Sequence, residues 1–508
     1  MLTPVRTDAA AIPRADPAPR ASGIRLEVWI LAAITLIGAA LRFATIASQS
    51  YWLDEATTVH ELHLSFGSML HAVANNESTP PLYYVLGWLW AKVFGTGAAG
   101  LRSLSALAGV CAIPVAYLCG RDLVSRAAGL VAAALTAVSP FMIWYSQEAR
   151  AYMLFALLCG LSFMFFVRAR REPSHRNLGW WAVCSSLAVL THFFAGFVIA
   201  PEAIWLLIAL RSRTAVLSAA VVAAAQLALL PLLVGDLGHP LLGWITQFPL
   251  SIRIQQIPVA FAFGTLYQSS LVNDGLVGAA CLIVFLSGLV LFGADRTARR
   301  AAAAAATVVA AAILVPLVLA EAGHDYYVAR NLIGAWIPLV VLVGIACTAI
   351  RTLPGGAALA ALLLGSFVFA QAKIDADPQY QRPDWQGVAA ALGHPLSRRA
   401  IVAYDGPFAV TPLSIYLPGV SLNQPSDAGV TVSELDVVGN TWQTAATRMP
   451  AGMRLIGTRV VNQFLIARFS ITPARRLTPA AINSEAASLV SPASAGAATI
   501  VQEPHLAG

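Results

Sequence analysis

Long apolar runs separated by short polar connections dominate the chain between residues 28 and 372. An α-helix needs about 20 apolar residues to cross a hydrocarbon core about 30 Å thick, and most of these runs reach that length. The first run is too long for the core of a signal peptide and lacks a clear cleavage site, so we expect it to be retained as a helix. We predict about eleven transmembrane helices, near 28–46, 101–119, 127–145, 151–167, 178–192, 193–210, 214–234, 275–293, 301–320, 332–350 and 355–372.

The amino-acid composition supports a lipid environment for these runs. Hydrophobic residues make up 58% of the 508 residues, charged residues only 11%, and the mean hydropathy is +0.71. Soluble proteins carry about a quarter charged residues, so this chain has too little polar surface to cover a water-soluble core. The predicted fold class is an all-α polytopic membrane protein with a small α/β domain outside the membrane at the C-terminal end.

The charge of the chain does not indicate a nucleic-acid partner. The net charge is +7, but the arginines lie in short clusters between apolar runs rather than along a basic stripe of a soluble segment. The six cysteines all lie within apolar segments, so neither a disulfide framework nor a zinc site is expected.

The arginine clusters predict how the chain is oriented in the membrane. If the N-terminus is cytoplasmic, alternation of the spans places every short basic connection on the cytoplasmic side, as the positive-inside rule requires. The acidic segments with Asp54, Glu55, Glu148 and Asp325 then lie on the outer side of a plasma (inner) membrane. This topology requires that residues 80–95 form a helix in the outer interface, and a twelfth span there would invert all later loops. The basic connections contain Arg121, Arg126, Arg168, Arg170, Arg171, Arg176, Arg211, Arg213, Arg296, Arg299, Arg300 and Arg351.

The remaining segments complete the expected domain organisation. Residues 1–25 are rich in Ala, Pro, Arg and Asp and are expected to be a disordered cytoplasmic N-terminus. The membrane domain covers 26–372, with interfacial helices at about 56–95. Strand-like alternation at 400–404 and 455–468 predicts an extracytoplasmic α/β domain over 373–475, and 476–508 is expected to be a flexible tail.

The first outer loop contains two adjacent carboxylates in the sequence YWLDEATTVH, residues 51–60. Asp54 or Glu55 at a membrane boundary can act as a general base that takes a proton from an acceptor hydroxyl or amine. The alternative is that the pair only marks a solvated loop.

The second outer connection contains Glu148 and Arg150 in YSQEARAYM, residues 145–153. Almost no loop separates the two flanking spans, so both charges lie near the lipid boundary, where they are costly and often functional. The alternative is an ion pair of Glu148 with Arg150 or Arg102 that fixes the helix ends.

Two further segments offer groups for a phosphate. Arg330 begins a span in EAGHDYYVARN, residues 321–331, and its guanidinium can bind phosphate oxygens bidentately. Tyr326 lies in the same segment, and His192 at the third outer edge is a candidate phosphate contact or proton carrier. The alternatives are an arginine that extends to water at a helix end and a packed, hydrogen-bonded histidine.

Taken in order, YWLDEA, TPPLYY, YSQEARAYM and the Arg330 segment resemble GT-C glycosyltransferases of the dolichyl-phosphate-mannose protein mannosyltransferase and aminoarabinose transferase type. The resemblance covers about residues 25–372, and the RPDW segment at 382–385 fits bacterial members. It implies a GT-C-like multi-span fold and an inverting transfer of a mannose- or aminoarabinose-like sugar from a polyprenyl-phosphate donor. The acceptor would be a protein, lipid or glycan, and the C-terminal domain matches no acceptor-recognition module.

The resemblance also implies roles for individual residues. Asp54 would be the catalytic base with Glu55 beside it, and Glu148 would orient the acceptor or a divalent cation. Some members of the family use Mg or Mn and others need no metal, so Asp54 and Glu148 are possible metal ligands. The remaining predicted site residues are Arg150, Arg330, His192 and Tyr326 for the donor phosphate, and Tyr83 and Tyr84 for the acceptor or interface.

Two other functions are compatible with a polytopic membrane protein. A transporter or flippase of lipid-linked sugars usually has ionisable groups near the bilayer midplane, whereas the charges here cluster at the outer ends of the spans. An inactive relative that serves as a scaffold would tolerate loss of Asp54 and Glu148.

Overall fold

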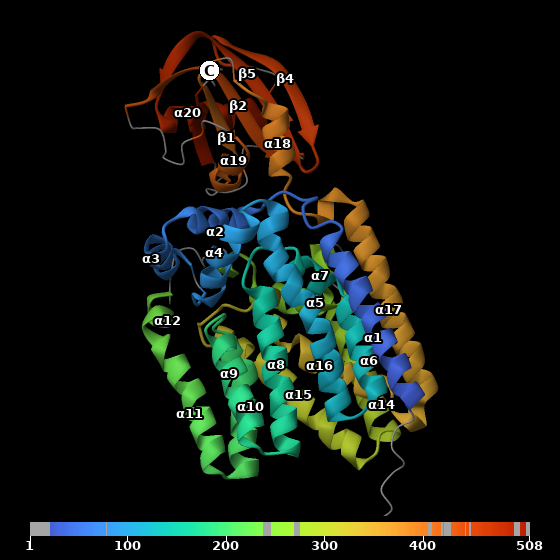
Figure 1. Ribbon diagram of the computed structural model, residues 1–508. Helices are drawn as coiled ribbons and strands as arrows, with labels where there is room; N and C mark the ends of the chain where they lie inside the picture. The colour runs from blue at the N-terminus through green and yellow to red at the C-terminus, as the bar shows by residue number, and fades with distance from the viewer. Residues whose placement is uncertain are drawn as a thin grey trace, which may run out of the picture.

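The computed structural model consists of a bundle of helices with a small α/β domain at one end (Figure 1). It describes residues 21–503, apart from 78, 237–244, 269–274, 396, 405–408, 418–419, 421–427, 442, 447–448 and 492–497. The predicted disordered segment 1–25 therefore lies mostly outside the described residues, and the first helix begins at Ala21.

The bundle has a helix at each of the eleven predicted spans, but the number eleven is not confirmed. Within the described residues, eight helices are long and apolar enough to cross a membrane, or nine if the pair α6–α7, bent by 58°, counts as one span. The predicted spans at 178–192 and 193–210 form helices of only 15 and 16 residues, which rise about 24 Å at most. The bundle helices are α1 (Ala21–Phe43), α5 (Ala98–Leu123), α6 (Arg126–Val138), α7 (Pro140–Ser146), α8 (Tyr152–Arg171), α9 (His175–Val189), α10 (Ala195–Leu210), α11 (Arg213–Ala228), α12 (Leu230–Asp236), α13 (Leu250–Phe263), α14 (Gly275–Gly293), α15 (Arg296–Glu321), α16 (Trp336–Cys347) and α17 (Leu353–Ala376).

One bundle helix was not predicted. Helix α13 carries Arg253 in its first turns and two glutamines after it, which interrupt the apolar run that would have marked it as a helix in the membrane domain. The Arg253 side chain is nevertheless buried, because it binds Asp325 and the carbonyl of Tyr327.

Three short helices lie between the bundle and the α/β domain (Figure 1): α2 (Leu53–His63), α3 (Phe66–Asn76) and α4 (Leu82–Phe94). Pro80 and Pro81 precede α4, where a missing backbone N–H costs no helical hydrogen bond. These helices occupy the segment for which interfacial helices were predicted, and their depth in a membrane stays a prediction.

The C-terminal domain is a mixed five-stranded sheet in the order β4-β5-β2-β1-β7. Strands β1 and β2 are parallel and the other pairs are antiparallel. Alternate side chains pack against α20 on one face and against α18 and α19 on the other. The elements are α18 (Trp385–Leu392), β1 (Arg399–Ala403), α19 (Val410–Tyr416), β2 (Val430–Asn440), β3 (Thr444–Ala445), β4 (Met453–Val461), β5 (Phe464–Leu477), α20 (Pro479–Leu489), β6 (Val490–Ser491) and β7 (Ala498–Gln502).

The expected boundary at 475 is wrong, because the domain continues through much of the segment that was expected to be a flexible tail. Helix α20 buries Ile482 and Leu489 in the core, and β7 pairs antiparallel with β1 and buries Ile500. In the described part of this Ala- and Ser-rich segment, the few large apolar residues include several that are buried in the core, a pattern that the average composition does not show.

Candidate active site

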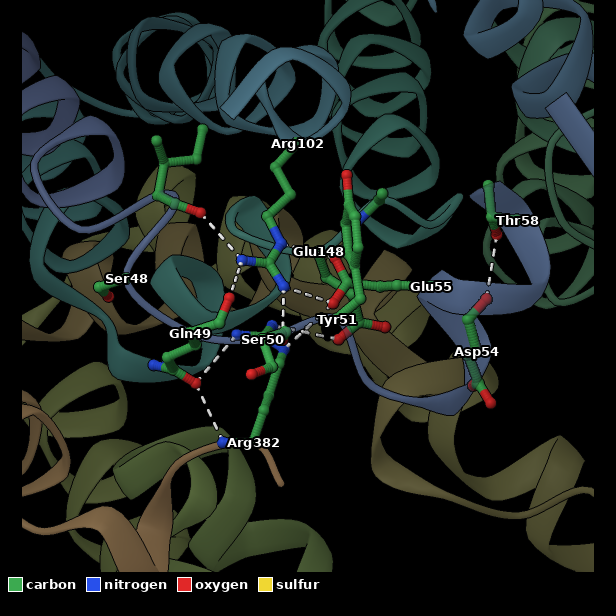
Figure 2. A network of polar contacts seen from close by, with 12 residues as sticks. Ser48, Gln49, Ser50, Tyr51, Asp54, Glu55, Thr58, Arg102, Glu148 and Arg382 are labelled. Carbon is green, nitrogen blue, oxygen red and sulfur yellow. Dashed lines mark hydrogen bonds and ion pairs between the residues drawn. The ribbon is translucent and has the colours of Figure 1, made fainter. Parts of the chain in front are cut away.

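Four segments that are far apart in the sequence meet at the end of the bundle next to the C-terminal domain. They are the start of α2, the connection between α7 and α8, the 3₁₀ helix η5 (Ala329–Ala335), and the linker that leads from α17 to α18. Figure 2 shows a large part of this polar network, and in that view Asp54 and Glu55 point in different directions from the same turn of α2.

Asp54 and Arg330 form an ion pair at the partly accessible side of the site. The Arg330 Nη1 donates to Asp54 Oδ2 at 3.0 Å, and the two side chains are 18% and 22% exposed. The guanidinium lies 5.7 Å from the ring centres of both Trp52 and Tyr152. A carboxylate and a cation that solvent and ligands can reach are thus placed side by side.

Glu55, which was predicted to be catalytic, is a buried structural anchor instead. Its side chain is fully buried and accepts two hydrogen bonds of 2.7 Å from Arg102, while Ala149 N donates to Oε1 at 2.9 Å. The same Arg102 guanidinium also donates to the carbonyls of Ile46, Gln49 and Ser50. Glu55 therefore fixes the start of α2 against α5 and is not available as a base.

Glu148 is fully buried beside a second arginine, Arg382. The Arg382 Nη2 lies 3.5 Å from Glu148 Oε2, and Glu148 Oε1 has no hydrogen-bond partner in the described part of the chain. Burial raises the pKa of Glu148 to about 7, and Arg382 opposes that rise. The charges of Glu55 and Asp54 also raise the pKa of Glu148, and the charge of Arg330 lowers it.

Arg150, a predicted phosphate ligand, is paired with a buried carboxylate in the structure. Its guanidinium donates to both oxygens of Glu77, at 2.8 and 2.7 Å, and to the hydroxyl of Tyr84 at 2.8 Å. The alternative that Glu148 pairs with Arg150 or Arg102 is also not what is found, because each of these arginines has another carboxylate as its partner.

A further acidic residue, Glu61, lies near the pair of Arg150 and Glu77. Glu61 is 2% exposed, and neither of its carboxyl oxygens has a hydrogen-bond partner among the described residues. Burial and the neighbouring Glu77 raise the pKa of Glu61 to about 8, while Arg150 lowers it. Glu61 follows Asp54 by seven residues, so both lie on one face of α2.

Three of the four remaining predicted side chains are packed in the protein. Tyr83 and Tyr84 are fully buried, so they do not form an exposed surface for an acceptor. The ring of His192 stacks on Phe155 at 4.6 Å, and its Nδ1 accepts a hydrogen bond from the backbone N–H of Phe194. The ring stacking and this hydrogen bond show His192 as a packed residue, which was the alternative to a phosphate contact.

Tyr326 lines a mainly apolar cavity in the bundle. The cavity has a volume of about 620 Å³ and is formed mainly by α10, α11 and α15. Phe197, Val222 and Leu319 are among its apolar lining residues, and His324 and Tyr326 contribute polar groups. The segment that contains them is held by Arg253 and leads directly into η5, which carries Arg330.

The described residues do not fit the possible Mg or Mn site on Asp54 and Glu148. No group of three or more His, Cys, Asp or Glu side chains that could hold a metal occurs among them. Each of the two carboxylates faces an arginine, Arg330 and Arg382 respectively, so positive charge already occupies the space beside it. We therefore assign no step to a metal ion.

The sequence did not reveal most of the partners that organise the site. Arg382, Glu77, Glu61 and Arg253 were not predicted to belong to it. The RPDW motif at 382–385 was a usable signal for Arg382, whereas Glu61 lies within α2 and Glu77 directly follows α3, with no motif that marked either of them.

Residues 78–234 match the family model for dolichyl-phosphate-mannose-protein mannosyltransferase. An uncharacterised protein of Aquifex aeolicus is 30% identical over 171 residues, which are 32% of this chain and 33% of that protein. The chain thus spans about a third of the length of this curated relative.

Solved structures with the same architecture include ArnT from Cupriavidus metallidurans in the apo state. It is 12% identical, with a TM-score of 0.51, and the match covers 88% of this chain and 98% of ArnT. The archaeal oligosaccharyltransferase AglB from Archaeoglobus fulgidus, solved with an inhibitory peptide and a dolichol-phosphate, matches at 16% identity over 72% of this chain and 58% of AglB, with a TM-score of 0.43. The chain thus shares the fold of ArnT, and residues 78–234 are similar to the mannosyltransferase family.

Proposed function

We propose that the chain transfers a mannose- or aminoarabinose-like sugar from a polyprenyl-phosphate donor to a protein, lipid or glycan acceptor outside the cytoplasm. The observation that carries this proposal is the contact between Asp54 and Arg330, which places a candidate base beside a candidate phosphate ligand. ArnT, which shares the fold, has also been solved bound to undecaprenyl phosphate.

The donor would be held by two neighbouring features. Its phosphate would bind Arg330, which can donate two parallel hydrogen bonds to phosphate oxygens. Its prenyl chain would enter the apolar cavity of about 620 Å³, which is lined in part by Tyr326, four residues before Arg330 in the sequence. A lipid-linked sugar matches this combination of a cation and an apolar cavity better than a nucleotide sugar does.

Binding of the donor would also activate the base. In the structure Arg330 is paired with Asp54, and a phosphate would compete with that carboxylate for the guanidinium. Asp54 would then be free to accept the proton of the acceptor hydroxyl or amine while the acceptor oxygen or nitrogen bonds to the anomeric carbon. The bond from that carbon to the phosphate oxygen breaks on the opposite face, and its electron pair leaves with the polyprenyl phosphate, which inverts the configuration.

The test is direct turnover by the purified chain in phospholipid and detergent. A panel of polyprenyl-phosphate sugars is incubated with it, and release of polyprenyl phosphate and of labelled sugar is followed together. The proposal predicts release that depends on Asp54, with transfer to an added acceptor or slow transfer to water. Movement of an intact donor across a vesicle membrane without cleavage would instead identify a flippase.

A further inference from the structure

Arg382 joins the two carboxylate-bearing segments of the site. Its side chain is 1% exposed, and its guanidinium lies 4.0 Å from the centre of the Trp144 ring. Nη2 donates to the carbonyl of Trp144 at 3.1 Å and lies 3.5 Å from Glu148 Oε2, while Nε lies 3.6 Å from Glu55 Oε2. The arginine is thus placed between the α7–α8 connection and the start of α2 (Figure 2).

The residue belongs to the linker of the C-terminal domain and not to the bundle. It follows α17 and precedes α18, and its backbone carbonyl accepts a hydrogen bond from Gln463 at the turn between β4 and β5. Its own backbone N–H donates to Gln49 Oε1 at 3.0 Å. The position of the Arg382 side chain therefore depends on contacts with both parts of the molecule.

Neighbouring contacts fasten the same linker to the residues just before Asp54. The Ser50 hydroxyl donates to Asp384 Oδ1 at 3.1 Å and accepts from the backbone N–H of Gln386 at 2.9 Å. The backbone N–H of Tyr51 donates to the Tyr416 hydroxyl of α19 at 2.8 Å. The C-terminal domain is consequently attached to the loop that leads into the candidate base.

We propose that Arg382 is a positioning residue through which the C-terminal domain holds Glu148 and the start of α2 in the arrangement required for turnover. This inference rests on the proposed function, and it assigns the domain a part in organising the active site in addition to any contact with an acceptor. Asp54 remains the group that exchanges a proton with the acceptor, and Arg382 acts on it through its neighbours.

The positive charge of Arg382 should have a measurable effect on the pKa of Glu148. Burial raises the pKa of Glu148 to about 7, and Arg382 is the strongest of the groups that lower it. Replacing Arg382 by a neutral residue should therefore raise the pKa of Glu148 by about 1 to 3 pH units and leave it protonated at neutral pH. The other charged or titratable groups that act on Glu148 or are influenced by it are Asp54, Glu55, Arg330, Tyr83 and Tyr152.

The experiment compares Arg382→Gln, Arg382→Lys and a matched buried control, Arg42→Gln. Arg42 is fully buried in α1 and donates to the Ser146 hydroxyl and to three backbone carbonyls, with no carboxylate among those partners. We expect Arg382→Gln to lower kcat about tenfold or more and to move the acidic limb of the kcat profile to higher pH. Arg382→Lys, which keeps the positive charge, should leave the acidic limb of the kcat profile at the wild-type pH. Arg42→Gln should lower the stability of the protein and also leave this limb at the wild-type pH.

A second measurement reads Glu148 without turnover. Infrared difference spectroscopy over a pH titration follows the protonated carboxyl band of Glu148, which is identified as the band that Glu148→Gln removes. The pH midpoint of this band in Arg382→Lys and in Arg382→Gln shows whether the positive charge at position 382 sets the pKa of Glu148. A midpoint and a kcat limb that stay at the wild-type pH in Arg382→Gln overturn the inference. If the wild-type chain cleaves no donor while the midpoint moves as expected, the proposed function fails and the coupling of Arg382 to Glu148 stands.

Discussion

The carboxylate of Asp54 accepts a hydrogen bond from the guanidinium of Arg330 at 3.0 Å, although 276 residues separate them in the chain. Both side chains keep some exposure, whereas the neighbouring Glu55, Glu148, Arg102 and Arg382 are almost completely buried. An ion pair that a ligand can reach is one that a competing phosphate can open.

Replacing Asp54 by Asn should separate binding from turnover. The amide cannot accept the proton, so turnover should fall about 10²- to 10⁴-fold. Arg330 loses the competing negative charge, so affinity for undecaprenyl phosphate should rise about 1.5- to 5-fold, as expected for a partly exposed ion pair. Calorimetry with the lipid phosphate in detergent measures the affinity, and weaker binding by the variant would contradict the competition.

Replacing Arg330 by Gln should have the opposite effect on binding. Loss of charge-assisted hydrogen bonds should weaken affinity for undecaprenyl phosphate about 10- to 100-fold, and Arg330→Lys should recover part of it. The same calorimetric titration provides the measurement. Affinity equal to that of the wild type would remove Arg330 from the donor site.

Arg150 should differ from Arg330 in its effect on stability. It binds a buried Glu77 through two hydrogen bonds, so Arg150→Gln leaves that carboxylate uncompensated and should cost about 3–5 kcal/mol of unfolding free energy. The double variant with Glu77→Gln should regain part of the loss, and thermal unfolding of the purified protein measures both. Unchanged stability combined with lost donor affinity would return Arg150 to the phosphate site.

The cavity predicts a dependence on the length of the prenyl chain. Ala219 lines it from α11, so Ala219→Phe should raise KM about fivefold or more for a long-chain donor and change KM little for a short-chain donor. Val221 is 56% exposed on the same helix and is not a lining residue, so Val221→Phe is the matched control. Equal effects of the two variants would count against the cavity as the lipid site.

Glu61 should make the folded protein less stable as pH rises. Its pKa is raised from an ordinary value of 4.5 to about 8 in the folded protein, so the folded state holds a proton that the unfolded state releases between these two values. The stability present below the lower value is lost progressively up to about pH 8. Glu61→Gln should therefore gain on the order of 1–3 kcal/mol relative to the wild type between about pH 5 and pH 9, measured by thermal unfolding at each pH. A constant difference across this range would contradict the buried, protonated carboxyl.

The sequence carried enough information for the membrane architecture and for the segments that form the site. Uninterrupted apolar runs identify helices because the bilayer imposes their length, and the fold shared with ArnT confirms the predicted GT-C-like fold. Helix α13 was not predicted because Arg253 is a charged residue in the sequence, although Asp325 neutralises its charge in the folded bundle.

Assignment of partners within the site was less accurate, for a physical reason. Glu55 and Asp54 are adjacent in the sequence but point to different environments, and only the fold decides which one meets Arg102 and which one meets Arg330. The partners of Arg150 and Glu148 lie 73 and 234 residues away. A charged motif indicates that a carboxylate or a guanidinium has a role at a position, but it does not identify the opposite charge that neutralises that group.

Strand β7 gives the late part of the chain a role that its small, simple residues conceal. It covers the outer edge of β1, and Gln502 Oε1 accepts two hydrogen bonds from the buried Arg399 guanidinium. A version of the protein shortened to residue 475 would expose a row of unpaired backbone groups and deprive a buried cation of this amide partner. An unpaired strand edge can form hydrogen bonds with the same edge of another molecule, so shortened versions should associate through this sheet. An affinity tag is therefore better placed before α1 than in place of β7.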